Sequence, residues 1–252
     1  MKSETLYLLY GIVFSQSEGR HTCPALPPGV DGAPVTLIEE DGLGAAVSWI
    51  DPQNVTPDIS RLLSYARAVE RLHAERVILP MRYGCLLTDE CQVAELLRAQ
   101  REEYLALLRE LDGCVEMGVR ILLPRGSSSH SASGSESQWS SGRAYLADRA
   151  ARYVEDAEIE RTLSAVAERL RSSLGALARK TKIEQSLLPN RRLSSFYFLV
   201  RRNAVNLFRT AFSELSRAEP ARLLLSGPWP PYNFGNVAAL DQHQPVVGSQ
   251  LR

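Results

Sequence analysis

The sequence predicts an α+β protein with two domains. The first is a modified ferredoxin-like domain, residues 1–125, and the second is an α+β domain with long, coiled-coil-like helices and a small sheet, residues 143–234. Three observations predict this class. Strand-like apolar runs alternate with two amphipathic helical stripes in the first half. A serine-rich stretch, 126–142, has almost nothing to bury and is typical of a flexible linker. A long helical region then precedes further strand-like runs, and the polar tail 235–252 is expected to be disordered.

Five strands are expected in the first domain. Residues 6–14 form a near-continuous apolar run, the pattern of a central strand covered on at least one face. Residues 35–39 and 45–50 flank an Asp-Gly-Leu-Gly turn and predict a hairpin. A phosphate loop is the other interpretation of that turn, but it lacks a third glycine and opens no helix. A short strand, 77–79, and an alternating strand, 115–123, complete the set.

Two helices are expected on one face of this antiparallel-rich sheet. The first begins at Thr56-Pro57-Asp58, with the Thr56 hydroxyl as its N-cap and a proline in its first turn. The second begins at Thr88-Asp89 and ends before Gly113. Apolar residues at helical spacing predict the buried stripe of the first helix: Ile59, Leu62, Leu63, Ala66, Val69 and Leu72.

The second domain is expected to combine long helices with about three strands. Residues 143–179 are predicted to be helical, with an apolar stripe at the spacing of a helical hairpin or coiled-coil seam. That stripe contains Leu163, Val166, Ala167, Leu170, Leu174 and Leu177. Residues 182–188 and 194–200 are strand-like, Asn203 is the expected cap of a further helix, and 222–226 is the last strand.

An unusual segment follows the last strand: Gly227, Pro228, Trp229, Pro230, Pro231 and Tyr232. The glycine is expected to end the strand, and the prolines prevent further regular pairing while two aromatic rings remain to be buried. The favoured interpretation is an intramolecular clamp that buries Trp229 and Tyr232 on the sheet of its own domain. Burial across on the first domain, or a PxxP ligand for a partner's aromatic groove, are the alternatives.

Composition and charge exclude several classes of function. The 252 residues are 44% hydrophobic, with 29 Lys plus Arg balanced by 29 Asp plus Glu. A formal net charge of zero argues against a general nucleic-acid binder and makes self-association easier. The four cysteines form no C-x-x-C pair, so free thiols in a reducing cytoplasm are expected. No stretch approaches the roughly 20 apolar residues of a membrane span. Glu4 before the apolar run 6–14, and Tyr7, Tyr10 and Gly11 within it, argue against a signal peptide.

No catalytic, cofactor-binding or metal-binding residues are predicted. The four histidines lie in unrelated segments, without the spacing that places two metal ligands on one helical face. Arg82 could bind an anionic ligand or make structural contacts. Cys85, close to Arg82, could have a lowered pKa and act as a nucleophile, but no general base follows it, which favours a buried thiol.

Several motifs together resemble the gas vesicle accessory proteins of the F/L family. The family's Leu-Pro-x-Arg-Phe-Gly phrase is similar to Leu79–Gly84, with Pro80, Arg82 and Gly84 in matching positions and Tyr83 in place of phenylalanine. Its Gly-x-Ala-Tyr-Leu phrase resembles Gly142–Leu146. Its closing Gly-Pro-Trp-Pro-Pro-Tyr-x-Phe phrase matches Gly227–Tyr232 and Phe234. These matches extend over most of residues 5–235.

The resemblance implies a cytoplasmic, non-enzymatic protein of the gas vesicle. Its expected partners are the small hydrophobic shell protein and other accessory proteins, with the helical region 145–177 and the sheet edges as contact surfaces. A small-molecule-binding regulator that uses Arg82 as an anion anchor is the alternative from a different functional class, and a Cys85-dependent enzyme is another.

Overall fold

The structure is a computed structural model, and it describes residues 6–15, 19–22, 28–56, 58–122, 142–188 and 191–235. The expected linker over 126–142 and the expected tail over 235–252 lie almost entirely outside this part. The chain divides into two compact units. One contains the residues up to Glu116 together with those from Pro228, and the other spans Met117–Gly227. The α+β class and two antiparallel sheets confirm the predicted class, whereas the ferredoxin-like arrangement stays a prediction.

The first sheet is built around a central strand. Its order is β2-β3-β4-β1-β5, with β6 also pairing with β1. The strands are β1 (Leu6–Phe14), β2 (Gly19–Thr22), β3 (Thr36–Glu40), β4 (Leu43–Ile50), β5 (Ile78–Pro80) and β6 (Leu86–Leu87). Strand β1 is buried from Tyr7 to Val13 on both faces, which confirms the central strand. The hairpin between β3 and β4 is also confirmed, since Asp41 and Gly42 have φ of 49° and 82°.

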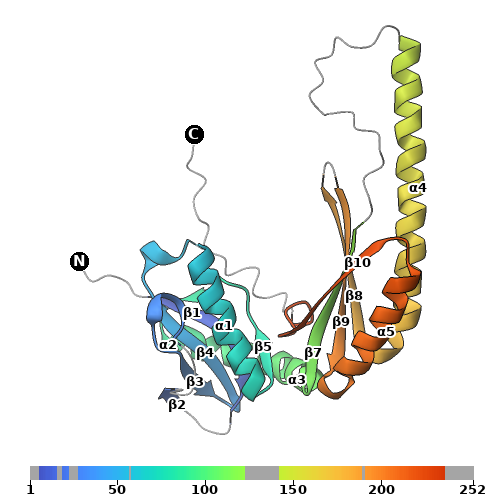
Figure 1. The fold of residues 1–252 in the computed structure, drawn as a ribbon. Helices are drawn as coiled ribbons and strands as arrows, with labels where there is room; N and C mark the ends of the chain where they lie inside the picture. Colours follow the sequence, from blue (N-terminus) through green and yellow to red (C-terminus); the bar gives the residue numbers. More distant parts are fainter. Residues whose placement is uncertain are drawn as a thin grey trace. The chain divides into compact units, whose positions relative to one another are not determined.

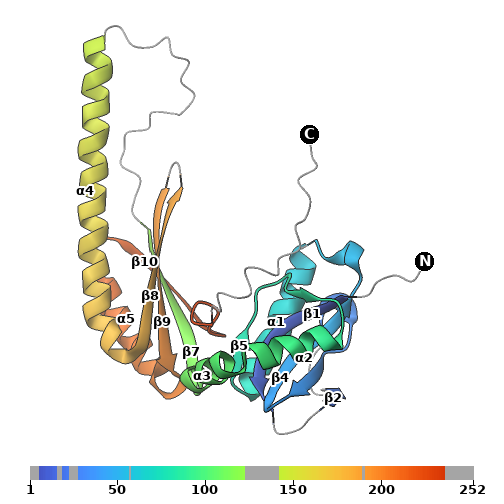
Figure 2. The ribbon, with the colours of Figure 1, turned by 180° about the vertical axis from the view of Figure 1, so that it is seen from behind.

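Three helices cover this sheet: α1 (Ile59–Glu75), α2 (Glu90–Ala99) and α3 (Arg101–Leu111). Helix α1 lies over one face, while α2 and α3 lie over the other (Figures 1 and 2). The prediction of two helices on one face was therefore wrong, because strands buried on both faces need cover on both. The predicted second helix is divided at Gln100, and Gly113, with φ of 66°, follows its end as expected.

The caps of the helices differ in part from those expected. The Asp58 carboxylate accepts a hydrogen bond from the Arg61 N–H at 2.8 Å, so Asp58, not Thr56, is the N-cap of α1. Asp89 caps α2 in the same way through the Gln92 N–H. Helix α5 begins after a 3₁₀ turn and has no side-chain cap, so the predicted Asn203 cap was wrong.

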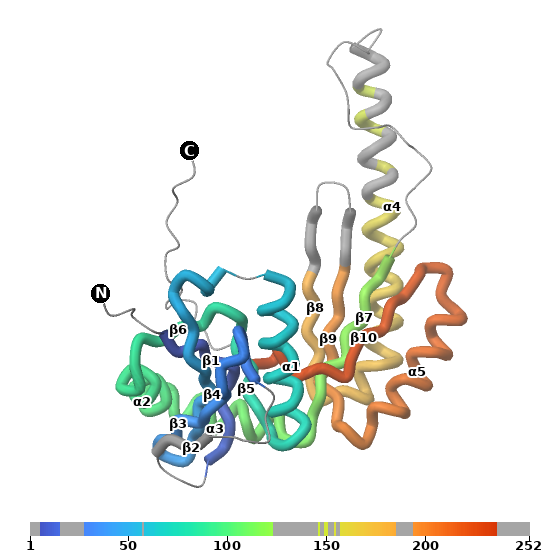
Figure 3. The backbone as a smooth tube through the Cα atoms, turned by 60° about the vertical axis from the view of Figure 1, so that its left-hand side comes forward, coloured from blue at the N-terminus to red at the C-terminus, as the bar shows by residue number. Residues whose placement is uncertain are grey.

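The second sheet has the order β10-β7-β9-β8 (Figure 3). Its strands are β7 (Cys114–Leu122), β8 (Ala178–Leu188), β9 (Arg191–Arg201) and β10 (Arg222–Trp229). Strand β7 was expected in the first sheet, and its place in the second corrects that prediction. Alternation along a strand shows that one face is buried but does not show which sheet the strand joins.

Two helices belong to the second sheet's unit, α4 (Gly142–Leu174) and α5 (Val205–Ala218). The predicted stripe of α4 is buried at Leu163, Val166, Leu170 and Leu174. Phe208 of α5 packs against Phe198 of β9, with ring centroids 5.3 Å apart. An ion pair joins Arg169 of α4 to Glu219, which follows α5. The stripe therefore forms core, and a coiled coil stays a prediction.

The last strand is longer than expected. Strand β10 continues through Gly227 and Pro228 to Trp229, so the prediction that Gly227 ends it was wrong. An edge position explains why proline is tolerated. Within the described residues β10 has β7 as its one neighbour, and proline, which lacks an N–H donor, is accepted on edge strands.

Candidate functional site

The candidate site is an exposed apolar patch at the start of α1. Ile59, Leu62 and Leu63 are 78%, 44% and 51% exposed, and we call these three residues the α1 patch. They were expected to lie in the buried stripe of the helix, and that prediction was wrong for this first turn. Three large aliphatic side chains together on one short surface are typical of a protein contact.

The geometry of the helix explains both the burial and the exposure. The buried residues of α1 include Tyr65, Ala68, Val69 and Leu72, which recur at i, i+3, i+4 and i+7. At about 3.6 residues per turn, the α1 patch lies roughly a third of a turn away from them. The exposure of the α1 patch could therefore be predicted from the sequence. The apolar residues of the helix form two stripes, and only one of them can face the sheet.

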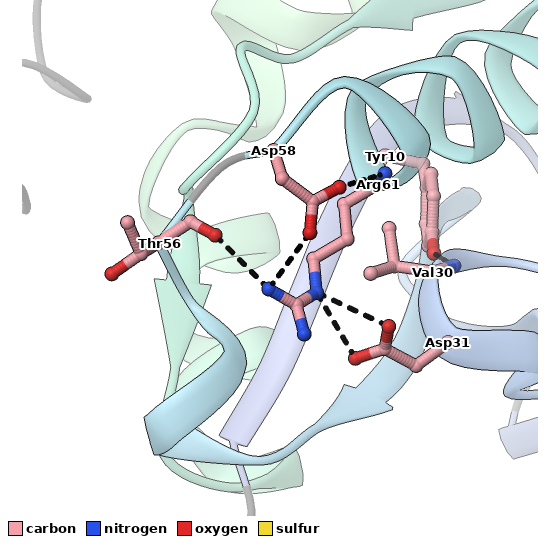
Figure 4. Close-up of polar contacts among 6 residues, drawn as sticks. All are labelled: Tyr10, Val30, Asp31, Thr56, Asp58 and Arg61. Atoms are coloured by element: carbon pink, nitrogen blue, oxygen red, sulfur yellow. Dashed lines mark hydrogen bonds and ion pairs between the residues drawn. The ribbon is translucent and has the colours of Figure 1, made fainter.

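Arg61 anchors the start of α1 to its surroundings (Figure 4). Its Nε lies 3.1 Å from Asp31 Oδ1 and 3.4 Å from Oδ2. Its Nη1 lies 3.2 Å from Asp58 Oδ2 and 3.3 Å from the Thr56 carbonyl oxygen. The hydrogen bond with Asp31 raises the pKa of Arg61 above its ordinary value. A single guanidinium thus joins the helix cap, the preceding loop and the 3₁₀ turn Val30–Gly32.

The turn that receives Arg61 is itself fixed to the sheet. Asp31 has φ of 52° and ψ of 26°, a left-handed conformation that costs energy in a residue other than glycine. The neighbouring Val30 N–H donates to the Tyr10 hydroxyl at 2.9 Å, and that hydroxyl lies 2.9 Å from Ser48 Oγ. These contacts hold the turn in place, so the α1 patch sits on a rigid base.

Tyrosine side chains fill the core beneath α1. The buried Tyr65 hydroxyl lies 2.9 Å from the carbonyl oxygen of Met81, which follows β5, and 3.0 Å from that of Leu9 in β1, so both are backbone acceptors within its reach. Its ring stacks on Tyr10 at 4.8 Å and meets Tyr83 edge-on at 5.4 Å. Burial raises the pKa of Tyr65 well above its ordinary value, so the hydroxyl stays protonated.

The motif segment Pro80–Gly84 forms a tight turn beside this cluster. Pro80 ends β5 opposite Gly11, and Gly84 has φ of 92°, which accounts for a glycine at that position. Arg82 is exposed, and its carbonyl oxygen accepts the Cys85 N–H at 3.4 Å. Cys85 is half-buried, and burial raises the pKa of its thiol to about 11. The raised pKa argues against the alternative of a thiol activated by Arg82 and agrees with the favoured interpretation of a core thiol.

The closing segment, which we call the closing arm (residues 230–235), packs in the first unit. Tyr232 packs against the buried cluster that contains Tyr65. Burial raises the pKa of Tyr232 above its ordinary value. The Asn233 backbone N–H and side-chain amide donate to the Glu116 carboxylate at 2.8 and 2.7 Å. Gly235 lies so close to Leu79 that an added Cβ would be 2.6 Å from its Cδ1.

These contacts correct two details of the expected clamp. Trp229 is 44% exposed, so the expected burial of its ring was wrong. The ring of Tyr232 also packs on the core cluster of the first unit, whereas its expected place was the sheet of β10. The structure therefore brings Pro80, Pro231 and Tyr232 into one unit, while Gly227 and Pro228 remain part of β10.

Neither a metal cluster nor a membrane-spanning helix occurs among the described residues. Among the residues that the structure describes, no three His, Cys, Asp or Glu side chains gather to hold a metal ion. The described helices include none with the length and apolar character that crossing a membrane requires. Cys85, Cys91 and Cys114 are in the thiol form, and Cys23 lies outside the described residues.

A family model described as gas vesicle synthesis protein GvpL/GvpF matches residues 6–236. The chain belongs to the GvpL/GvpF family. The match confirms the resemblance drawn from the motifs. Gas vesicle protein F of a Streptomyces species is 27% identical, covering 90% of this chain and 98% of that protein. Gas vesicle protein F2 of Halobacterium salinarum is 25% identical, covering 93% of this chain and 94% of its own length.

Solved structures of GvpF share the fold of this GvpL/GvpF member. The crystal structure of GvpF from Anabaena aligns with a TM-score of 0.74 at 18% identity, covering 92% of this chain and 97% of that one. GvpF from Microcystis aeruginosa aligns with a TM-score of 0.72 at 15% identity, covering 93% and 100%. Homology to gas vesicle proteins F and L supports a gas vesicle-related accessory role.

Proposed function

We propose that this GvpL/GvpF member binds the small hydrophobic shell protein of gas vesicles and supports vesicle assembly. The observation that carries the proposal is the α1 patch, in which Ile59, Leu62 and Leu63 expose aliphatic side chains to solvent. A shell protein with apolar segments needs a partner with an apolar surface until it is incorporated, because exposed apolar surface otherwise aggregates.

The arrangement of the patch suits an apolar helix or strand of a partner. Ile59, Leu62 and Leu63 stand at i, i+3 and i+4, the spacing with which one helix presents a contact face. Arg61 and Asp58 provide a polar rim, which is the usual border of a protein interface. The cap and the Arg61 anchor fix the helix before binding, so little conformational entropy remains to be lost.

The long helix α4 offers a second contact surface within the same proposal. Leu146 and Val154 are 65% and 63% exposed, within the helical region expected to contact partners. Other gas vesicle accessory proteins are further proposed partners, and the proposed location is the cytoplasm at the vesicle. The α1 patch remains the primary surface because the hydrogen bonds of Asp58 and Arg61 fix the start of the helix that carries it.

Capture of the purified shell protein by the immobilised protein tests the proposal. The double variant Ile59→Gln/Leu63→Gln should bind less than a tenth as much shell protein as the wild type, since both side chains are exposed and their replacement spares the core. Leu207→Gln is the matched control, because Leu207 is 58% exposed on α5 and belongs to the other unit. Failure of the wild type to capture shell protein would refute the function. Equal capture by the double variant would refute the site.

A further inference from the structure

The outer edge of the second sheet is open to strand pairing within the described part of the unit. Strand β8 is the last in the order β10-β7-β9-β8, and it spans 11 residues from Ala178 to Leu188 (Figure 3). Its sequence contains neither proline nor glycine. An edge strand presents a row of backbone N–H and C=O groups on its outer side, and such a row can pair with another strand.

The other sheet edges in the described chain are poorer templates. The opposite edge of the second sheet, β10, contains Gly227 and Pro228, which interrupt pairing. The edges of the first sheet are short, since β2 has four residues and β5 has three and ends at Pro80. Short strands and prolines are the usual protection of an edge, and β8 has neither.

Two residues at the centre of β8 carry opposite charges. Lys182 Nζ lies 3.0 Å from Glu184 Oε1, so the two side chains share one face of the strand and neutralise each other. Ile183 between them lies on the opposite face and is 45% exposed. Lys182, which would otherwise protect the edge by repulsion, is therefore balanced by Glu184, while Arg179 and Lys180 lie nearer the start of the strand.

We propose that β8 pairs antiparallel with β8 of a second copy of this chain, centred on Ile183. In such a pair, a residue that precedes Ile183 by a given number of positions lies opposite the residue of the second copy that follows Ile183 by the same number. Lys182 then lies opposite Glu184 of the second copy, and two-fold symmetry makes the same contact twice. The two Ile183 side chains lie opposite each other on the other face. A formal net charge of zero adds little long-range repulsion between the copies.

The area of one strand pair implies a weak and concentration-dependent association. A single pair of strands buries less than the roughly 1,200 Å² of a stable standard interface. The pairing is therefore a contact between copies brought close together, and the measurements must include high protein concentrations. The proposed pairing depends on the edge of β8 alone and is independent of shell-protein binding.

Charge exchange across the proposed pair gives a direct test by sedimentation velocity. Either single variant, Lys182→Glu or Glu184→Lys, creates two contacts between like charges across the pair. Each variant should therefore self-associate about ten-fold more weakly than the wild type. An equal mixture of the two variants should associate as strongly as the wild type, because every facing pair is again opposite in charge. Wild-type protein that stays monomeric at millimolar concentration, or a mixture as weak as its components, would overturn the proposal.

Two controls address the register and the folding of the variants. Lys180→Glu makes the same charge change on the same strand, but position 186 opposite it holds a serine in the sequence, so association should change less than two-fold. In a background that replaces the exposed Cys91 with serine, Ile183→Cys should form a disulfide-linked dimer on mild oxidation. Thr181→Cys should not, because two copies of position 181 are too far apart. Equal cross-linking of both cysteine variants would overturn the register.

Discussion

Asn233 donates two hydrogen bonds to the carboxylate of Glu116, one from its backbone N–H at 2.8 Å and one from its side-chain amide at 2.7 Å. The two residues are 117 positions apart, and Glu116 is only 4% exposed. A buried carboxylate needs donors, and the closing arm supplies them. This contact holds the end of the chain to the first unit.

Asn233→Ala should therefore lower the free energy of unfolding by about 2 kcal/mol, the usual loss when a hydrogen bond to a buried charged group is removed. Urea-induced unfolding measures it. Asn206→Ala, at an exposed position on α5, should change stability by less than about 0.5 kcal/mol. Equal effects of the two substitutions would contradict the role assigned to Asn233.

The two aromatic residues of the closing segment should differ in their contribution to stability. Tyr232→Ala should cost about 3 kcal/mol, since its ring packs against the core cluster. Trp229→Ala should cost about 1 kcal/mol or less, because the indole is 44% exposed. Thermal unfolding of both variants tests this order. A larger loss of stability from Trp229→Ala than from Tyr232→Ala would mean that the indole stabilises the protein more than the tyrosine ring does.

Removal of the Tyr65 hydroxyl should destabilise the protein, whereas removal of the Tyr83 hydroxyl should not. Tyr65→Phe leaves the buried Met81 carbonyl without its donor and should cost about 1–2 kcal/mol. Tyr83→Phe is the matched control, because the Tyr83 hydroxyl has no hydrogen-bond partner within the described chain. Denaturant unfolding curves of the two variants should differ accordingly, and coincident curves would contradict the donor role.

Cys85 should react slowly with alkylating reagents. Burial raises its pKa from 9.0 to about 11, and a difference of two pH units means about 100-fold less thiolate at any pH below 9. The exposed Cys91 should therefore be labelled first by iodoacetamide at pH 8, as mass spectrometry can follow. Preferential labelling of Cys85 would restore the hypothesis of a reactive cysteine.

The same shift gives a pH dependence of stability. A thiol whose pKa is higher in the folded state binds its proton more tightly there. The contribution of the Cys85 thiol to the free energy of unfolding is fully present below pH 9 and is lost as the pH rises from 9 towards 11. Cys85→Ala should remove this loss, so the variant and the wild type should diverge in their dependence on pH only above pH 9, in unfolding experiments at graded pH.

Local patterns predicted the elements of the fold well, because they depend on neighbouring residues. The apolar run of β1 and the Asp41-Gly42 turn were both evident from the sequence. The partner of a strand is not a local property, and β7 was therefore assigned to the wrong sheet. Gly227 was taken to end the last strand and the following prolines to prevent further pairing, since the sequence does not reveal an edge position, where proline is tolerated.

The candidate site was predictable only in part. Motifs identified Pro80, Gly84 and Tyr232. The two motifs are about 150 residues apart in the sequence, so their presence in the same unit could not be deduced from it. The α1 patch was missed because its residues were merged with the buried stripe, although the angle between the two stripes follows from helix geometry. The Arg61–Asp31 ion pair joins a loop to a helix and leaves no periodic signal.

The position of the closing arm has a consequence for biosynthesis. The chain leaves the first unit after Glu116 and returns to it at Pro228, so the second unit is a continuous insertion within a discontinuous one. During translation, all of the second unit has been synthesised before the residues that complete the first. The first unit therefore reaches its final packing only when Tyr232 and Asn233 have left the ribosome, so its core closes after the whole second unit has been synthesised.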